Sequence, residues 1–312
     1  MLRLDRVSKT FRTGSFGGRE LHAVREVGFE VAQGEVVSLI GESGSGKTTL
    51  GRMILRLAAV SAGAITLDGV DIARQKDYYR SVQGVFQDPF SSYNPIFKAD
   101  RVLEMIRQRF FPRMGAADWR GRVESSLAAV RLDPGGVLGK YPHQLSGGQL
   151  QRLLIARALL LDIRMLVADE IISMLDASTR IDVLNLLGEL KGRGLGILFI
   201  THDLSLGNYV SEKTVVLRSG RVVEMGRTEL VFGNPLHPYT RNLLGSVPRL
   251  HRRWSEEEEE EEEDAPEAEA TCFYHGAAGH DATWPGLVEA EPGHFVGCAT
   301  SGTCASALEL VR

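Results

Sequence analysis

The chain has 312 residues, of which 43% are hydrophobic, and this length allows about two folded units. No run approaches the roughly 18–20 uninterrupted apolar residues that a membrane-spanning helix needs, and the first six residues lack the apolar core of a signal peptide. We therefore expect a cytoplasmic protein, and its three cysteines (Cys272, Cys298 and Cys304) do not suggest a disulfide framework.

Charge is divided unevenly along the chain. Residues 254–312 contain 15 of the 40 acidic residues and only one of the 36 basic residues, which leaves 25 acidic and 35 basic residues in the rest. A basic body suits a polyanionic ligand such as a nucleotide or nucleic acid, or an anionic membrane surface. Surface lysines and arginines can also serve solubility alone, so charge does not choose between these functions.

The first strong motif follows an apolar run at residues 36–40, which predicts a buried strand. Residues 41–48 match the phosphate-loop pattern G-x-x-x-x-G-K-[ST] in full, and residues 48–57 are compatible with a helix. In such a loop, backbone N–H groups surround phosphate oxygens, Lys47 reaches the terminal phosphates and the Thr48 hydroxyl binds Mg²⁺. The predicted nucleotide-binding residues here are Gly41, Glu42, Ser43, Gly44, Ser45, Gly46, Lys47, Thr48 and Thr49.

A helical region is predicted next, because residues 100–132 are rich in helix formers. It lies between two predicted buried strands, so we expect an inserted helical subdomain at about residues 95–150. Near its end, Ser146 and two glycines stand just before a helix, where they form a second anion-binding helix N-terminus.

Two further apolar strands end in polar residues. Residues 165–168 lead to Asp169 and Glu170, and residues 196–200 lead to His202. Short buried strands that alternate with helices indicate an α/β domain with a largely parallel sheet, whose ligands bind at the carboxyl ends of the strands. Beside a phosphate loop, Asp169 can hold Mg²⁺ and Glu170 can orient or deprotonate the attacking water.

The C-terminal part changes character. Residues 214–217 and 221–224 predict a hairpin, and residues 239–244 predict a helix. After Trp254 come eight consecutive glutamates, Glu256 to Glu263. Because such a block repels itself, we expect residues 254–312 to be an acidic, disordered linker and tail.

Taken in order, these motifs resemble the ATP-binding cassette (ABC) family, whose signature motif is Leu-Ser-Gly-Gly-Gln. That motif stands here as Leu145, Ser146, Gly147, Gly148 and Gln149. Over residues 1–232, the resemblance implies an α/β fold with a P-loop NTPase (RecA-like) core, an antiparallel β subdomain and the helical insertion. It also implies that two ATPase domains pair head to tail, with the signature of one closing over the γ-phosphate held by the other.

The resemblance carries over residue by residue. Gln87 matches the Q-loop glutamine, Asp176 the D-loop, and His202 the switch histidine that contacts the γ-phosphate, while Phe11 stands where an adenine-stacking aromatic is usual. The ligands implied are ATP and Mg²⁺. The catalytic set is Lys47, Glu170 and His202, and the Mg²⁺ ligands are Thr48, Gln87 and Asp169.

The sequence departs from the family pattern at two positions. Ile171 follows the catalytic glutamate where Pro is common, and a Tyr is common where Phe11 stands. Neither change removes a charged or metal-binding group, so we expect hydrolysis to survive.

A narrower resemblance begins at Gly233, where Asn-Pro-Leu-His-Pro-Tyr-Thr is similar to the C-terminal extension of ATPase subunits from oligopeptide, dipeptide and nickel importers. We expect this extension at residues 233–253. It implies a peripheral protein on the cytoplasmic face of the inner membrane that couples Mg-ATP hydrolysis to solute uptake. The implied partners are a second ATPase subunit (a sibling or a copy), two transmembrane permease subunits and, indirectly, a solute-binding protein.

The resemblance implies peptides as the transported solute, and oligosaccharides and nickel remain alternatives. A soluble ABC ATPase that acts on nucleic acid or ribosomes is the other class of function. Such proteins usually have a coiled-coil or zinc-bearing insertion, or two cassettes in one chain, and the sequence shows none of these. We therefore expect no nucleic-acid partner.

Some relatives carry a cysteine-ligated iron–sulfur cluster beyond the extension. A four-iron cluster normally uses four cysteines, and this chain has three. His275, His280 or His294 could supply a fourth ligand, but the ligand count favours inert thiols, and we do not expect a cluster.

Overall fold

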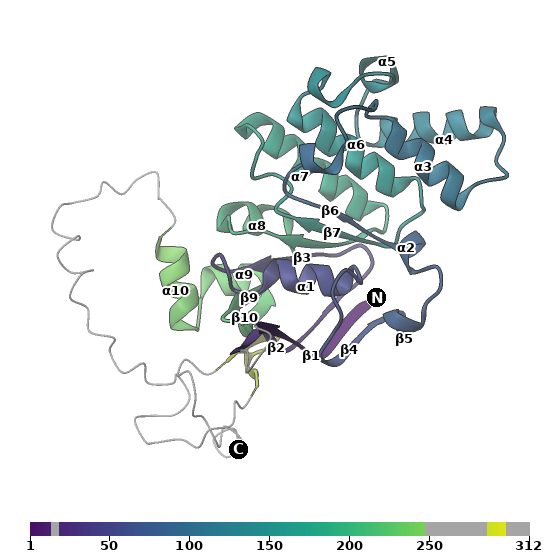
Figure 1. The fold of residues 1–312 in the computed structure, drawn as a ribbon. Helices are drawn as coiled ribbons and strands as arrows, with labels where there is room; N and C mark the ends of the chain where they lie inside the picture. The colour runs from purple at the N-terminus through teal and green to yellow at the C-terminus, as the bar shows by residue number, and fades with distance from the viewer. Residues whose placement is uncertain (14–18, 247–285, 298–312) are drawn as a thin grey trace, which may run out of the picture.

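Two β-sheets and a group of helices make up the protein, seen in a computed structural model that describes residues 1–13, 19–246 and 286–297 (Figure 1). The larger sheet has the strand order β11-β12-β10-β9-β3-β8-β7-β6. Within it β9, β3, β8, β7 and β6 run parallel, and β10, β12 and β11 are added antiparallel. The parallel strands are β3 (Val36–Ile40), β6 (Val82–Val85), β7 (Met165–Asp169), β8 (Gly196–Ile200) and β9 (Lys213–Arg218).

The parallel strands form the centre of the core. Every residue of β3, β7 and β8 is buried, as expected for strands that are covered on both faces. The sequence prediction of buried strands at residues 36–40, 165–168 and 196–200 is confirmed, and so is the α/β class.

A four-stranded antiparallel sheet packs beside this core, in the order β2-β1-β4-β5. It consists of β1 (Leu2–Thr13), β2 (Arg19–Val31), β4 (Ala62–Leu67) and β5 (Val70–Asp71). Its buried side chains, among them Val27 and Phe29, join one apolar cluster with Leu50 and Met53 of α1 (Lys47–Ile54). This sheet is the antiparallel subdomain that the family resemblance implied.

The helical subdomain gathers on the opposite side of the parallel strands (Figure 1). It contains α3 (Arg101–Phe110), α4 (Ala116–Ala129), α5 (Pro134–Val137) and α6 (Gly147–Leu159), and α7 (Ala177–Gly192) packs next to it. Leu127 of α4, Leu150 and Leu153 of α6 and Leu187 of α7 share one buried cluster. The insertion is therefore anchored to the core by ordinary apolar packing.

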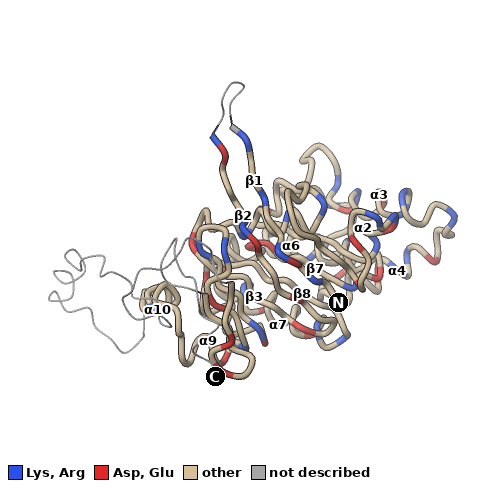
Figure 2. Tube along the Cα trace, turned by 90° about the horizontal axis from the view of Figure 1, so that it is seen from below, with Lys and Arg blue, Asp and Glu red and all other residues tan. Residues whose placement is uncertain are grey.

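Figure 2 views the molecule from below and shows β1 and β2 projecting together from the rest of the chain. Lys and Arg are interspersed with Asp and Glu along most elements in this view. The excess of basic residues in the body therefore does not define one binding face by itself.

Several short elements were not predicted. They are α2 (Tyr78–Ser81), α8 (Leu204–Val210), α9 (Thr228–Gly233) and the single turns Ile72–Arg74, Phe90–Ser92 and Pro142–Gln144. Helix α1 ends at Ile54 rather than residue 57, because Leu55 leaves the helical conformation and Arg56 takes a positive φ of 56°. Elements of a single turn have too few residues to show a period.

The C-terminal part differs most from expectation. Strand β10 (Arg221–Arg227) and helix α10 (Pro238–Gly245) extend the predicted hairpin and helix. Strands β11 (Val288–Glu291) and β12 (His294–Val296) form a second hairpin that pairs with β10. The prediction of a disordered tail over residues 254–312 is wrong for this hairpin, because the glutamates dominate the composition and hide a short strand pattern.

Other expectations for the tail fall outside the described residues. These are the run Glu256 to Glu263, the three cysteines Cys272, Cys298 and Cys304, and the histidines His275 and His280. Among the described residues, no group of three or more His, Cys, Asp or Glu side chains is arranged to hold a metal ion.

Candidate functional site

Six of the predicted site residues meet at one edge of the large sheet. Strands β3, β8 and β7 are parallel neighbours, so their carboxyl ends lie side by side. The loops that leave these ends surround a cavity of about 560 Å³. Its lining residues are Ser43, Thr48, Arg52, Phe86, Gln87, Asp88, Asp169, Glu170 and His202.

The loop after β3 depends on two glycines. Gly41 has a φ of 150°, and a Cβ atom there would lie 2.1 Å from the carbonyl oxygen of Leu217. Gly46 has a φ of 108°, and its Cβ would lie 2.4 Å from the carbonyl oxygen of Ala23. Only glycine fits these two positions, because both the backbone conformation and the space exclude a side chain.

Lys47 is folded back onto the loop. Its Nζ atom donates hydrogen bonds to the carbonyl oxygens of Gly41 at 2.6 Å and Glu42 at 2.8 Å. Burial lowers the pKa of Lys47, and the nearby carboxylates of Glu170, Asp169 and Glu42 oppose this shift. Because Lys47 is only 5% exposed, water screens its charge little, and its attraction for an anion is stronger than that of an exposed lysine.

Helix α1 begins at Lys47, and its N-cap residue is Gly46. Glycine has no side chain with which to cap the helix, so the first N–H groups of α1 are open to a ligand. Backbone N–H groups at a helix N-terminus bind phosphate oxygens well.

Asp169 and Thr48 bring two oxygen ligands together. The Thr48 hydroxyl donates to Asp169 Oδ1 across 3.4 Å, from α1 to the end of β7. Burial raises the pKa of Asp169, with a further rise from Glu170, while the Thr48 hydroxyl lowers it. Carboxylate and hydroxyl oxygens are the ligands that Mg²⁺ takes in phosphate sites, and the Gln87 side chain lines the same cavity.

Glu170 and His202 lie next to each other in the lining of the cavity. Oε1 of Glu170 lies 3.2 Å from Nδ1 of His202. Glu170 has a positive φ of 51°, and its backbone N donates to the carbonyl oxygen of Ile200 at 2.9 Å. A non-glycine residue held in this conformation is strained, and such strain concentrates at functional sites. The two isoleucines that follow Glu170 are buried in the core.

The signature residues lie at another place in the fold. Ser146 is the N-cap of α6: its Oγ accepts from Gln149 N at 3.2 Å, and Gln149 Oε1 accepts from Ser146 N at 2.9 Å. A Cβ atom at Gly148 would lie 2.5 Å from Thr179 of α7. Among the described residues that line the cavity, none comes from 145–149, so one chain does not bring its own signature to its own phosphate loop.

Asp176 adjoins the signature helix as the N-cap of α7. Its carboxylate accepts from Thr179 N at 3.0 Å, from the Ser178 hydroxyl at 2.6 Å and from the Thr179 hydroxyl at 2.8 Å. These hydrogen bonds, with that from Ser178 the strongest, hold the pKa of Asp176 well below its usual range. The carboxylate is therefore charged and fixed in position on the surface.

Phe11 is not brought to the cavity in this structure. It lies on β1 opposite Leu21, 39% exposed, with Lys9 Nζ 4.9 Å from its ring centroid. Its role in adenine stacking stays a prediction.

Two neighbours of the site were not found from the sequence. Arg52 lines the cavity one helical turn after Thr48, and the spacing of four residues on a predicted helix was a usable signal. The hydroxyl of Tyr239 accepts a hydrogen bond from Glu42 N at 3.0 Å. No local pattern joins these two residues, which are 197 positions apart.

None of the helices in the described ranges has the length and apolar character that crossing a membrane requires.

Comparisons with known proteins agree on one group. Residues 24–173 match the family model "ABC transporter", and residues 223–277 match "Oligopeptide/dipeptide transporter, C-terminal region". The chain is 38% identical to a putative peptide import ATP-binding protein of Brucella ovis, over 96% of this chain and 97% of that protein. It is also 38% identical to an oligopeptide transport ATP-binding protein of Streptococcus pyogenes serotype M1, over 90% of each.

A solved structure supports the same grouping. It is a dimeric ATP-binding cassette in a post-hydrolysis state, bound to ADP and Pi, and it matches with a TM-score of 0.64 and 28% identity. The match covers 73% of this chain and 99% of that one.

Proposed function

Since this chain belongs to the ATP-binding cassette (ABC) transporter family, we propose that it hydrolyses Mg-ATP to drive the uptake of peptides. One observation supports the chemistry above all others. The loop of residues 41–48, Asp169, Glu170 and His202 meet around one cavity, although they come from three separate parts of the chain. Phosphoryl transfer to water requires these parts: a phosphate cradle, a metal site and a group that positions the nucleophile.

The phosphate loop binds the nucleotide. The N–H groups at the start of α1 face the phosphates, and Lys47 supplies positive charge to the β- and γ-phosphates. In the structure Lys47 Nζ rests on the carbonyl oxygens of Gly41 and Glu42. Lys47 is thus already held against the loop proposed to bind the phosphates, which limits the entropy lost on binding.

Thr48 and Asp169 would hold Mg²⁺, and Gln87 lines the same cavity. Bound Mg²⁺ would neutralise charge on the phosphate oxygens and polarise the bond that breaks. The 3.4 Å contact between the Thr48 hydroxyl and Asp169 Oδ1 supports this assignment, because it places two oxygen ligands side by side.

Glu170 positions the attacking water and accepts its proton. Its side chain is 19% exposed and sits at the end of β7, directly after Asp169. His202 Nδ1 lies within reach of the Glu170 carboxylate, so it can hold that carboxylate in place and turn its other nitrogen toward the γ-phosphate.

The working unit is a pair of ATPase domains. Residues 145–149 form the capped N-terminus of α6 and lie away from the phosphate loop of their own chain. In a head-to-tail pair, this helix terminus would face the γ-phosphate held by the partner, with Asp176 along the interface. The partner is a sibling subunit or a second copy of this chain.

Several exposed apolar side chains after the Q-loop suit the permease partners. Phe90, Ile96 and Phe97 follow Gln87 in the chain, and Met105 lies on α3 of the helical subdomain; all four are exposed. We assign these side chains to contact with a transmembrane subunit on the cytoplasmic side of the membrane.

Peptides are the proposed solute, because the relatives in Brucella and Streptococcus carry that description and the matched C-terminal family is that of oligopeptide and dipeptide transporters. The test is reconstitution of this chain with its permease subunits in vesicles. A peptide-loaded binding protein should stimulate ATP hydrolysis, and binding proteins loaded with an oligosaccharide or with nickel should not. Stimulation by either of the latter alone would overturn the peptide assignment.

A further inference from the structure

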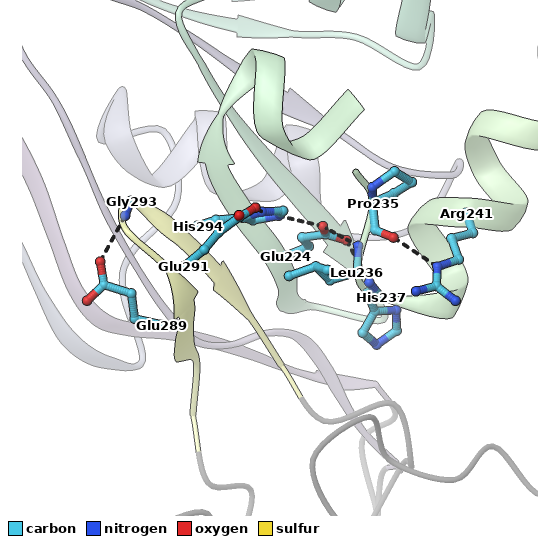
Figure 3. Close-up of polar contacts among 9 residues, drawn as sticks. All are labelled: Glu224, Pro235, Leu236, His237, Arg241, Glu289, Glu291, Gly293 and His294. Atoms are coloured by element: carbon cyan, nitrogen blue, oxygen red, sulfur yellow. Dashed lines mark hydrogen bonds and ion pairs between the residues drawn. The ribbon is translucent and has the colours of Figure 1, made fainter. Parts of the chain in front are cut away.

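Glu224 is a fully buried carboxylate of β10 that the proposed hydrolysis does not use. Its Oε1 atom accepts a hydrogen bond from Leu236 N at 2.8 Å, and its Oε2 atom accepts one from His237 N at 3.0 Å. Nε2 of His294 lies 2.7 Å from Oε1. Figure 3 shows how this carboxylate joins β10, the segment before α10 and the C-terminal hairpin.

His294 attaches the hairpin at this point. Its side chain is 0% exposed, and its Nδ1 atom lies 2.9 Å from Oε1 of Glu291. Both ring nitrogens therefore lie within hydrogen-bond distance of carboxylate oxygens. Backbone pairing of His294 with Gly226 supports the same attachment between β12 and β10.

The segment held by Glu224 leads to Tyr239. His237 is the N-cap of α10, and its Nδ1 atom accepts a hydrogen bond from Tyr239 N at 3.0 Å. The two rings meet edge to face with centroids 6.4 Å apart. The guanidinium of Arg218 lies 4.9 Å from the centroid of the Tyr239 ring. The aromatic ring is thus fixed by contacts with two different elements.

The hydroxyl of Tyr239 reaches the phosphate loop. It accepts a hydrogen bond from Glu42 N at 3.0 Å, within the stretch whose carbonyl oxygens hold Lys47 Nζ. Burial raises the pKa of Tyr239, so the hydroxyl stays neutral at ordinary pH. The contact fixes the second residue of the loop from outside the cavity.

We propose that Tyr239 is a positioning residue for the phosphate loop, and that Glu224 of β10, together with His294 of the C-terminal hairpin, holds it in place. This inference rests on the proposed function, because it takes the loop as the ATP site. A loop that is already held in its binding conformation loses less entropy when the nucleotide arrives. The C-terminal extension then contributes to ATP affinity without touching the nucleotide.

The test is Tyr239→Phe in the full chain, with Mg-ATP as the probe. The substitution removes only the hydroxyl and keeps the ring against His237 and Arg218. Loss of one hydrogen bond of ordinary strength should weaken Mg-ATP binding about threefold to tenfold. The KM for ATP should rise with it, and kcat at saturating ATP should stay unchanged, because Tyr239 does not meet the reacting atoms.

The matched control is Tyr209→Phe on α8. It removes a hydroxyl that donates a hydrogen bond to Asn185 Oδ1 of α7 at 3.0 Å. Its Mg-ATP affinity should equal that of the wild type. Equal affinity in Tyr239→Phe would overturn the inference while leaving the proposed function intact. A wild-type chain that does not bind Mg-ATP would instead overturn the proposed function.

A second variant, Glu224→Gln, tests the link from the hairpin. The amide keeps the size of the side chain but turns an NH₂ group toward one of the backbone N–H donors. We expect Glu224→Gln to bind Mg-ATP more weakly than the wild type. The double variant Glu224→Gln with Tyr239→Phe should lose no more Mg-ATP affinity than the weaker-binding of the two single variants. Multiplicative losses, or unchanged affinity in Glu224→Gln, would overturn the link. Glu289→Gln is the control, because its exposed carboxylate accepts a hydrogen bond from Gly293 N within the hairpin and does not contact Glu224 in the described structure.

Discussion

Nδ1 of His202 lies 3.2 Å from Oε1 of Glu170, and this pair joins the carboxyl ends of two adjacent parallel strands. The distance places an imidazole within hydrogen-bond reach of the carboxylate proposed to activate water. The orientation of the proposed base is thus set by a residue 32 positions later in the chain.

The sharpest prediction concerns Glu170→Gln. The amide keeps the size and the contact with His202 but cannot accept the proton of water, so hydrolysis should fall about 10²–10⁴-fold. Mg-ATP binding should persist, since Lys47, Thr48 and Asp169 are unchanged. Phosphate release and an ATP titration measure the two effects. Hydrolysis at the wild-type rate would show that another group activates the water.

Unhydrolysed ATP should also hold two ATPase domains together. We expect Glu170→Gln to shift to a larger size in chromatography when ATP is added, and Ser146→Arg in the same background to abolish this shift. Ser146→Thr is the control, because threonine keeps the hydroxyl that caps Gln149 N. If the partner is a sibling subunit, the experiment includes that subunit. A persistent ATP-dependent dimer in Ser146→Arg would remove the signature from the interface.

Lys47→Ala should abolish tight Mg-ATP binding. It removes a buried charge and also the two hydrogen bonds that brace the loop carbonyls. Lys76→Ala is the control, because it removes a lysine at an exposed position. Isothermal titration with Mg-ATP compares the two variants, and near-normal affinity in Lys47→Ala would contradict the phosphate-loop assignment.

Gly41→Ala should distort the phosphate loop. Its Cβ would overlap the carbonyl oxygen of Leu217, so the turn between β3 and α1 has to shift. We expect strongly weakened Mg-ATP binding in a titration of the variant. Gly69→Ala has a similarly positive φ of 79° but no neighbour within 4 Å, and it should bind Mg-ATP normally. Equal binding by the two variants would show that the close approach at Gly41 is unimportant.

His294→Ala should destabilise the whole domain. It leaves the buried Glu224 side chain without one of its three polar partners, and leaving a buried polar group without a hydrogen-bond partner costs about 1–3 kcal/mol. Urea unfolding followed by circular dichroism measures the change in the free energy of unfolding. His143→Ala removes an exposed histidine and should change it little. A loss as small as that of the control would mean that the hairpin does not contribute to the stability of the sheet.

The residues of the central site could be proposed from the sequence because short local motifs identify them. The loop at 41–48 is one contiguous motif, and Asp169, Glu170 and His202 follow predicted apolar strands, whose parallel arrangement brings their ends together. The contact between Tyr239 and Glu42 joins residues 197 positions apart and depends on how α10 packs. No pattern of composition or spacing could reveal it.

The hairpin at 288–296 was missed for a different reason. Its alternation covers only a few residues, and it follows a long acidic run that favours disorder. What orders it is the partner strand β10 and the buried Glu224, which are separated from it by about 70 positions. Patterns of neighbouring residues do not reveal a strand that is stabilised by residues distant in the sequence.

The added strands also change how the large sheet terminates. Without β12, the N–H and C=O groups of Glu224 to Gly226 would face solvent along an open strand edge, a template for pairing with another chain. With the hairpin in place, the edge strand is β11, which has four residues and carries two glutamates. A short, acidic edge is poorly suited to intermolecular strand addition, so we expect the hairpin to reduce pairing of this sheet edge with other chains.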